Sequence, residues 1–237
     1  MCGRYALYGP QSRLREAFML EFCPEYFARY NIAPQSRVLI IRHKPDSGRV
    51  GQLVRWGLIP SWTKDPGIGA RLNNARGETV AGKPAFRSSF ARHRCLIPAN
   101  GFYEWQAVAA DGKMRKQPWF VRPADSGSFF AFAGLLATWK TSADETIITT
   151  CIITTAANAL MAPIHDRMPA ILRPEQYDVW LDPANNDTGS LQAMIGPCCS
   201  EAMCASPVSP AINRGDVEGP QCIEPVAVAI GVERGAE

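Results

Sequence analysis

The fold class is decided by two apolar stretches, FFAFAGLLATW at residues 129–139 and TIITTCIITT at residues 146–155. Both are rich in aromatic and β-branched side chains, which pack well on the pleated surface of a sheet. We therefore expect both to be central strands. The longest apolar run, residues 129–137, is too short to cross a bilayer, so we expect no membrane segment.

Shorter strand signals lie around this pair. They are residues 38–42 and 50–56 with a turn at 45–48, residues 95–98 and 102–106 with a turn at Asn100-Gly101, and residues 118–122 after an Asp111-Gly112 hairpin signal. Helices are expected at residues 10–22, with Ser12 as the N-cap, and at residues 175–181. The pattern predicts one α+β domain around a strongly bent, barrel-like, mostly antiparallel sheet with flanking helices. We place this domain at residues 1–226 and expect a disordered tail at residues 227–237.

The composition is that of an ordinary globular protein, with 46% hydrophobic and 20% charged residues in a chain of 237. The eight cysteines form no Cys-x-x-Cys pair and are not spaced with the three histidines as zinc ligands would be. We interpret them as reduced thiols of a cytoplasmic protein, with a metal site at Cys198-Cys199-Cys204 as the alternative. The N-terminus has no apolar segment of the kind found in secretory signals.

The charge is unevenly distributed. Residues 1–100 contain sixteen Lys and Arg and six Asp and Glu, a balance of +10, whereas the remainder carries −7. This asymmetry indicates a surface in the first half that faces a polyanion. A solvated basic face without a partner explains the charge alone equally well.

Residues 1–4, Met-Cys-Gly-Arg, carry the most distinctive chemistry. When Met1 is removed, Cys2 has a thiol and a primary amine on neighbouring carbons. The amine has an ordinary pKa of ~8, against ~10.4 for lysine, and the thiol one of ~8.5. Both groups are nucleophilic near neutral pH. Such an aminothiol can attack an aldehyde through nitrogen and close through sulfur to a thiazolidine, or attack an amide through sulfur alone.

Two further residues are candidates for proton transfer. Glu104 lies between Tyr103 and Trp105 on an expected strand, and if it points inward, desolvation raises the pKa of its carboxyl towards the acid–base range. His165 lies in an expected loop with Asp166 beside it as an orienting partner. An outward-facing glutamate and a structural histidine are the alternatives.

Three arginines and two tryptophans are candidates for binding DNA. Arg4, Arg76 and Arg167 can clamp phosphates, because a guanidinium matches phosphate geometry. Trp56 and Trp62 can stack on bases, each stack contributing ~1–3 kcal/mol. Surface ion pairs and core packing are the alternatives for these residue types.

Five segments together resemble the SOS response-associated peptidase family, whose members are also called abasic site processing proteins. The segments are MCGR at 1–4, WGLIPSW at 56–62, NAR at 74–76, GFYEW at 101–105 and HDRMP at 165–169. The similarity runs in the same order from residue 1 to about 182 and weakens towards Asn213. Gly77, where the family usually has a larger residue, is a departure that touches no proposed catalytic group.

The resemblance implies a protein that captures abasic sites in single-stranded DNA. We expect this protein to be a cytoplasmic monomer, associated with the nucleoid if its source is prokaryotic. By family analogy, Cys2 removes Met1 by self-processing and then forms a thiazolidine with the open-chain sugar aldehyde. Asn74 would position Cys2, Glu104 would transfer protons and His165 would assist ring opening. Arg4, Trp56, Trp62, Arg76 and Arg167 would grip the strand. The family implies no metal or organic cofactor, and a lyase side activity by β-elimination.

Three other functions remain open. A glutamine amidotransferase with an N-terminal cysteine also begins Met-Cys-Gly, but residues 56–60 and 165–169 argue against it. A non-covalent single-strand binding module would need only the charge and the tryptophans. A peptidase acting on other proteins would require turnover of an external peptide.

Overall fold

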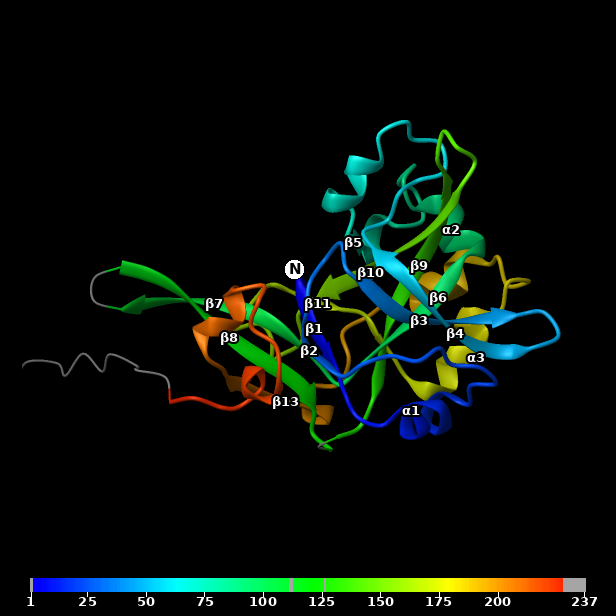
Figure 1. The fold of residues 1–237 in the computed structure, drawn as a ribbon. Helices are drawn as coiled ribbons and strands as arrows, with labels where there is room; N and C mark the ends of the chain where they lie inside the picture. The colour runs from blue at the N-terminus through cyan, green and yellow to red at the C-terminus, as the bar shows by residue number, and fades with distance from the viewer. Residues whose placement is uncertain (1, 111–112, 126, 228–237) are drawn as a thin grey trace, which may run out of the picture.

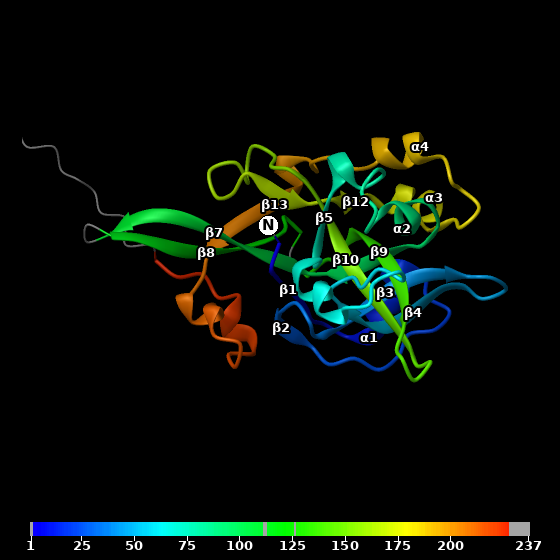
Figure 2. The ribbon, with the colours of Figure 1, turned by 90° about the horizontal axis from the view of Figure 1, so that it is seen from above.

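A closed barrel of five strands forms the centre of the fold (Figures 1 and 2). The computed structural model describes residues 2–110, 113–125 and 127–227. The barrel strands are β3 (Arg37–Lys44), β4 (Gly48–Trp56), β6 (Arg94–Ala99), β9 (Phe130–Lys140) and β10 (Thr146–Ala156). β9 pairs antiparallel with β6 and β10, β3 pairs antiparallel with β4 and β6, and β10 closes the ring in parallel with β4. The predicted α+β class and barrel-like, mostly antiparallel sheet are confirmed.

The two stretches that decide the fold class are the neighbouring barrel strands β9 and β10. The first eight residues of β9 are all buried, because one face lines the barrel and the other is covered. Two short helices contribute to this cover, α2 (Arg87–Arg92) against β6 and β9 and α3 (Tyr177–Leu181) against β6. The Trp180 ring meets Phe90 edge-on at 6.1 Å, which joins the two helices over the strands.

A second sheet has the strand order β13-β8-β7-β1-β2. Its strands are β1 (Arg4–Leu7), β2 (Arg29–Ile32), β7 (Gly101–Ala110), β8 (Lys113–Pro123) and β13 (Met203–Pro207). β7 and β8 form a long antiparallel ribbon that projects from the body, while β1 lies between this ribbon and the barrel (Figures 1 and 2). The predicted hairpin turn at residues 111–112 lies outside the described residues.

The C-terminal segment covers one face of this second sheet. Residues Val208, Ile212 and Cys222 form a small hydrophobic cluster with Tyr103 and Phe120. This cluster is separate from the main core inside and around the barrel. The expected disordered tail lies outside the described residues from residue 228 onward.

The remaining elements are short. They are α1 (Gln11–Phe18), α4 (Thr188–Ala193), β5 (Asn74–Arg76), β11 (Arg167–Pro169), β12 (Ile171–Leu172) and 3-10 helices at Pro66–Arg71, Gly77–Thr79, Pro174–Gln176, Ser200–Ala202, Pro210–Asn213 and Pro220–Cys222. Among the residues that the structure describes, no helix is long and apolar enough to cross a membrane.

Two local predictions were wrong. The first helix ends at Phe18 rather than residue 22, because Met19 takes a left-handed conformation with φ 50°. Its N-cap is Pro10, and Ser12 lies inside the helix. The strands do separate at residues 100–101, as predicted, but they do not form a hairpin. The chain leaves barrel strand β6 there and enters β7 of the second sheet. Gly101 is required there, since a Cβ would lie 2.2 Å from the Phe120 ring.

Candidate active site

Cys2 lies just before the start of β1, where that strand joins the second sheet. β1 pairs antiparallel with β7, with Arg4 opposite Tyr103. Glu104 is the next residue of β7, so the register brings this carboxylate to the N-terminal end of β1. Cys2 is completely buried, and its Sγ lies 3.9 Å from the carbonyl oxygen of Arg4. The pairing of β1 with β7 therefore places the thiol beside Glu104.

Asn74 reaches Cys2 from the barrel side. It begins β5, which pairs in parallel with β10. Its Nδ2 donates a hydrogen bond to the carbonyl oxygen of Cys2 at 2.8 Å. Its Oδ1 is buried and has no hydrogen-bond partner among the described residues. Asn74 thus fixes the backbone of Cys2 and keeps an acceptor available at the site.

Glu104 is a buried carboxyl, only 1% exposed. Burial raises its pKa above the ordinary value for glutamic acid, because desolvation disfavours the charged form. Burial, with a further contribution from the Glu104 charge, also raises the pKa of the Cys2 thiol. The resting thiol therefore keeps its proton, and a base must take that proton when the sulfur reacts. The sequence left two orientations open for Glu104, and the structure shows the inward one.

His165 lies opposite Glu104, with its Nε2 3.9 Å from Oε2 of the carboxylate. On the other side of the ring, Nδ1 accepts a hydrogen bond from the backbone N–H of Arg167 at 2.9 Å and lies 2.8 Å from Oδ1 of Asp166. The backbone N–H fits the neutral ring with its proton on Nε2, and the Asp166 carboxylate fits a ring protonated at Nδ1. Asp166, the candidate orienting partner, is thus in contact with the His165 ring.

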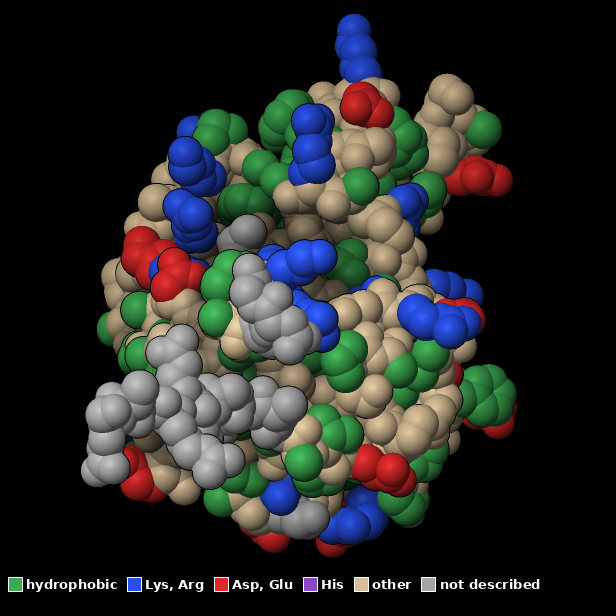
Figure 3. Space-filling model, turned by 90° about the vertical axis from the view of Figure 1, so that its left-hand side faces the viewer, with side chains coloured by type: hydrophobic (Ala, Val, Ile, Leu, Met, Phe, Trp, Pro, Cys, Tyr) green, Lys and Arg blue, Asp and Glu red, His purple; other side chains and the backbone are tan. Residues whose placement is uncertain are grey.

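An open pocket of about 430 Å³ leads to these groups. It is lined by Glu104, Trp105, Lys116, His165 and Asn213. Trp105 Nε1 donates to Asn213 Oδ1 at 2.7 Å, so the C-terminal segment supplies part of the wall. The face towards which the β7–β8 ribbon points is hollowed in its middle, and Lys and Arg side chains lie on several sides of the hollow (Figure 3).

The predicted DNA-binding residues have different environments. Arg76 is exposed, and the side chain of Trp62 is 62% exposed. Arg4 is half-buried and donates to Asn31. Arg167 is held by the Glu78 carboxylate and by the carbonyl oxygen of Thr154 at 2.7 Å. Arg4, Arg76 and Trp62 thus keep surface that a nucleic acid could contact.

Trp56 does not fit the predicted contact with DNA, because its side chain is fully buried. The ring packs edge-on against Tyr5 at 5.4 Å, and Nε1 donates to the carbonyl oxygen of Asn73 at 2.8 Å. Trp56 therefore supports the residue that precedes Asn74. Trp56 has a structural role, since it packs against the chain next to Asn74, the residue that holds Cys2.

Sequence reasoning missed Lys116, which lines the pocket, and Asn31, which lies outside the pocket and binds Arg4. Lys116 had a detectable signal, since it ends a short basic run at residues 113–116. Asn31 had none, because its contacts join β2 to Arg4 and to the distant residues 212–217. Residues 29–32 form β2, which is not among the strands predicted from the sequence.

The alternative of a metal site at Cys198-Cys199-Cys204 gains no support. Within the described ranges, no group of three or more His, Cys, Asp or Glu side chains could hold a metal ion. Cys198 Sγ contacts Met203 Sδ at 3.0 Å, Cys199 is exposed and contacts Glu201, and Cys204 faces the carbonyl oxygen of Pro123.

The fold and the site define a class of α+β barrel proteins in which the second residue, a cysteine, is buried beside an asparagine, a glutamate and a histidine. A family model described as SOS response associated peptidase matches residues 1–215. The chain belongs to this family, and the resemblance stated from the five segments is confirmed.

The relatives have a shared name. The chain is 41% identical over 227 residues to abasic site processing protein YoqW of Bacillus subtilis (strain 168), covering 94% of this chain and 99% of that protein. It is 28% identical over 284 residues to abasic site processing protein HMCES of Rattus norvegicus, covering 98% and 78%. Its fold is that of a Bacteroides thetaiotaomicron crystal structure, with a TM-score of 0.79, 24% identity and coverage of 95% and 100%.

Proposed function

We propose that this protein captures abasic sites in single-stranded DNA as a covalent crosslink through Cys2, after removing its own Met1. The observation that carries the proposal is the convergence of Asn74, Glu104 and His165 on a buried cysteine at position 2. The names of the relatives, abasic site processing proteins, support the same substrate. The pocket beside Glu104 is open to solvent and bordered by Lys116, as binding of an anionic strand requires.

Removal of Met1 must come first, since the Cys2 nitrogen is otherwise an amide and not a nucleophile. In the proposed step the Cys2 thiolate attacks the Met1 carbonyl carbon, and the peptide nitrogen leaves as an amine after accepting a proton. Water then hydrolyses the thioester and releases methionine. Glu104 suits the proton transfers, because burial raises the pKa of its carboxyl above that of an ordinary glutamic acid, in the direction that acid–base catalysis requires.

Capture then uses both groups of Cys2. The amine adds to the sugar aldehyde and loses water to form an imine. The thiol adds across the C=N bond, forming the C–S bond and returning its proton to nitrogen, which gives the thiazolidine. Asn74 holds the Cys2 carbonyl, so amine and thiol meet the same carbon within one site, and proximity lowers the barrier by several kcal/mol. If the sulfur fails to close, the imine can lose the 3′ phosphate by β-elimination, the proposed lyase side reaction.

His165 faces Glu104 across the site and suits the proton movements on the sugar oxygen. When the ring is neutral and Nδ1 accepts from the Arg167 N–H, its proton lies on Nε2, on the side of Glu104. A histidine in this state can donate a proton to the ring oxygen as the sugar opens to its aldehyde.

A denaturing gel tests the proposal. Purified protein is mixed with a single-stranded oligonucleotide that carries one abasic site, and intact mass reports loss of Met1. A shifted band that survives boiling in detergent, and is lost with Cys2→Ala, is expected. A complex that dissociates in detergent would instead favour a non-covalent binding module. Release of ammonia from glutamine, or turnover of an external peptide, would favour the other two alternatives.

A further inference from the structure

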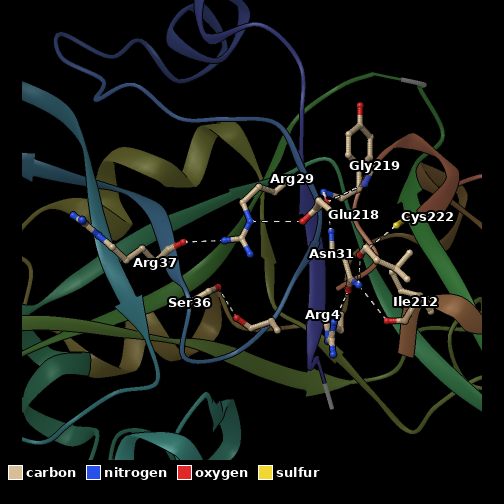
Figure 4. Close-up of polar contacts among 12 residues, drawn as sticks. Arg4, Arg29, Asn31, Ser36, Arg37, Ile212, Glu218, Gly219 and Cys222 are labelled. Atoms are coloured by element: carbon tan, nitrogen blue, oxygen red, sulfur yellow. Dashed lines mark hydrogen bonds and ion pairs between the residues drawn. The ribbon is translucent and has the colours of Figure 1, made fainter. Parts of the chain in front are cut away.

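Asn31 is a buried hub that joins Arg4 to the C-terminal segment (Figure 4). It lies on β2, is only 3% exposed, and both ends of its side-chain amide are engaged. Its Oδ1 accepts a hydrogen bond from Arg4 Nη1 at 2.6 Å. Its Nδ2 donates to the carbonyl oxygens of Ile212, Arg214 and Val217 at 3.2, 3.0 and 2.8 Å.

These partners allow only one orientation of the Asn31 amide. Carbonyl oxygens accept hydrogen bonds and a guanidinium only donates them. A flipped amide would direct Oδ1 at three carbonyl oxygens and the NH₂ group at the Arg4 cation. The C-terminal segment therefore fixes the direction in which Asn31 presents its oxygen to Arg4.

The hub holds Arg4 without cancelling its charge. Arg4 is two residues from Cys2, and no carboxylate pairs with it among the described residues. A guanidinium has five N–H donors, and Asn31 takes one through a neutral oxygen. An aspartate in the same place would hold Arg4 more tightly but neutralise it. A neutral acceptor is the choice expected for an arginine that must keep its charge for a phosphate.

The same segment also reaches the pocket. Glu218 accepts hydrogen bonds from the backbone N–H groups of Tyr30 and Asn31 and lies 3.8 Å from Arg29 Nε (Figure 4). Asn213, in the same segment, lines the pocket and accepts a hydrogen bond from Trp105 Nε1. Residues 208–223 are thus tied both to the residue that holds Arg4 and to the entrance of the site.

We propose that Asn31 is a positioning residue that directs the charged Arg4 guanidinium at a phosphate of bound DNA, and that the docked segment 208–223 sets its orientation. This inference rests on the proposed function and adds a determinant of strand binding. It assigns Asn31 to affinity for the DNA backbone rather than to the chemistry at Cys2.

The test measures affinity for an undamaged single-stranded oligonucleotide by fluorescence anisotropy, in which no crosslink can form. Asn31→Ala and Arg4→Ala are each expected to raise Kd about tenfold, as for loss of one charged contact. Each substitution should also lower the slope of log Kd against the logarithm of salt concentration by about 0.7, the value for one phosphate contact on a single strand. In the double variant the loss should equal that of Arg4→Ala alone.

Asn31→Asp provides a second variant, because its carboxylate cancels the charge of Arg4. Its second oxygen faces the carbonyl oxygens of residues 212, 214 and 217 and loses their hydrogen bonds, so urea unfolding of this variant is measured in parallel to establish that it is folded. It should show the same fall in affinity and in salt dependence. Glu218→Gln is the matched control, since its amide keeps one oxygen, and a single oxygen accepts from both the Tyr30 and the Asn31 N–H groups. The contact between Asn31 and Arg4 is left in place. The Kd of this control should stay within about twofold of the wild type.

Several results would overturn the proposal. They are additive losses in the double variant, wild-type affinity of Asn31→Asp, a loss in Glu218→Gln equal to that in Asn31→Ala, and no binding of undamaged strands by the wild type. Crosslinking of the abasic oligonucleotide at saturating DNA is measured in parallel, and its maximal rate should change less than about twofold in Asn31→Ala. Failure of the wild type to crosslink would refute the proposed function, while the anisotropy series would still decide the role of Asn31.

Discussion

Asn74 donates a hydrogen bond of 2.8 Å to the main-chain carbonyl of Cys2, although 72 residues separate them in the chain. The donor comes from a barrel-associated strand and the acceptor from the end of a strand in the second sheet. The reacting residue is therefore held where the two sheets meet. This contact makes the geometry of Cys2 depend on the barrel as well as on its own strand.

Removing this contact should affect rate more than binding. In Asn74→Ala the Cys2 carbonyl loses its side-chain donor, and we expect crosslinking at saturating DNA to slow by about 10–100-fold, because small misplacements of reacting groups are costly. Affinity for undamaged DNA should stay within about twofold. Asn73→Ala is the matched control, since its backbone carbonyl still accepts from Trp56. An equal slowing in both variants would assign the effect to the strand and not to the amide.

The aminothiol chemistry depends on the position of Cys2. Insertion of one alanine between Met1 and Cys2 should abolish the adduct, because the cysteine nitrogen remains an amide after methionine is lost. The denaturing gel measures this directly. Cys199→Ala removes an exposed thiol and should leave the adduct unchanged. Persistence of the adduct in the insertion variant would exclude thiazolidine formation.

Replacing Glu104 with Gln should separate catalysis from binding. The amide keeps the size of the side chain but cannot accept the proton of the Cys2 thiol. We expect a fall of about 10²–10⁴-fold in the rate of adduct formation, the usual contribution of a positioned acid or base. The Kd for single-stranded DNA should change less than about threefold. Parallel losses in rate and affinity would indicate that Glu104 binds the strand.

The same substitution should stabilise the protein at neutral pH. Burial raises the pKa of Glu104, so the folded state holds its proton to higher pH than the unfolded chain does. The free energy of unfolding therefore falls as pH rises through ~4.3, the ordinary value, and levels off above the raised pKa. The amide of Glu104→Gln cannot ionise. At pH 7 the free energy of unfolding of this variant should therefore exceed that of the wild type by ~1.4 kcal/mol for each pH unit by which folding raises the pKa of Glu104.

Urea unfolding near pH 3 and at pH 7 measures this difference. The stability advantage of Glu104→Gln should vanish near pH 3, because the Glu104 carboxyl of the wild type is then protonated in both the folded and the unfolded state. Glu25→Gln changes an exposed carboxyl and should show no pH-dependent gain. The difference in free energy of unfolding, variant minus wild type, should be larger at pH 7 than at pH 3. A smaller difference at pH 7 would contradict the raised pKa.

The two tryptophans should respond in opposite ways. Trp62→Ala removes an exposed ring, and we expect it to weaken DNA binding by ~1–3 kcal/mol, one stacked base, with the free energy of unfolding nearly unchanged. Trp56→Ala empties a buried site and should cost ~3–5 kcal/mol of stability. Anisotropy and urea unfolding measured on both variants check the contrast. Unchanged affinity in Trp62→Ala would remove this residue from the DNA site.

Local sequence pattern was sufficient to predict the central strands and the family of this protein. The composition of residues 129–139 and 146–155 identified the two central strands, since β-branched and aromatic side chains favour buried sheet positions. The five short segments identified the family and named Cys2, Asn74, Glu104 and His165. Residue type and order carry this information, because each segment is a run of a few consecutive residues and an aminothiol is defined by the residue at the N-terminus.

The environment of each of those residues depends on tertiary contacts. Trp56 and Trp62 belong to one segment and are chemically identical, yet one is in the core and the other on the surface, because barrel closure covers only the first. Arg167 is bound by Glu78, whereas Arg4 is held by a neutral amide and keeps its charge. Burial and partners arise from contacts between segments far apart in the chain. Local sequence cannot specify those contacts, since they depend on how the two sheets and the C-terminal segment pack together.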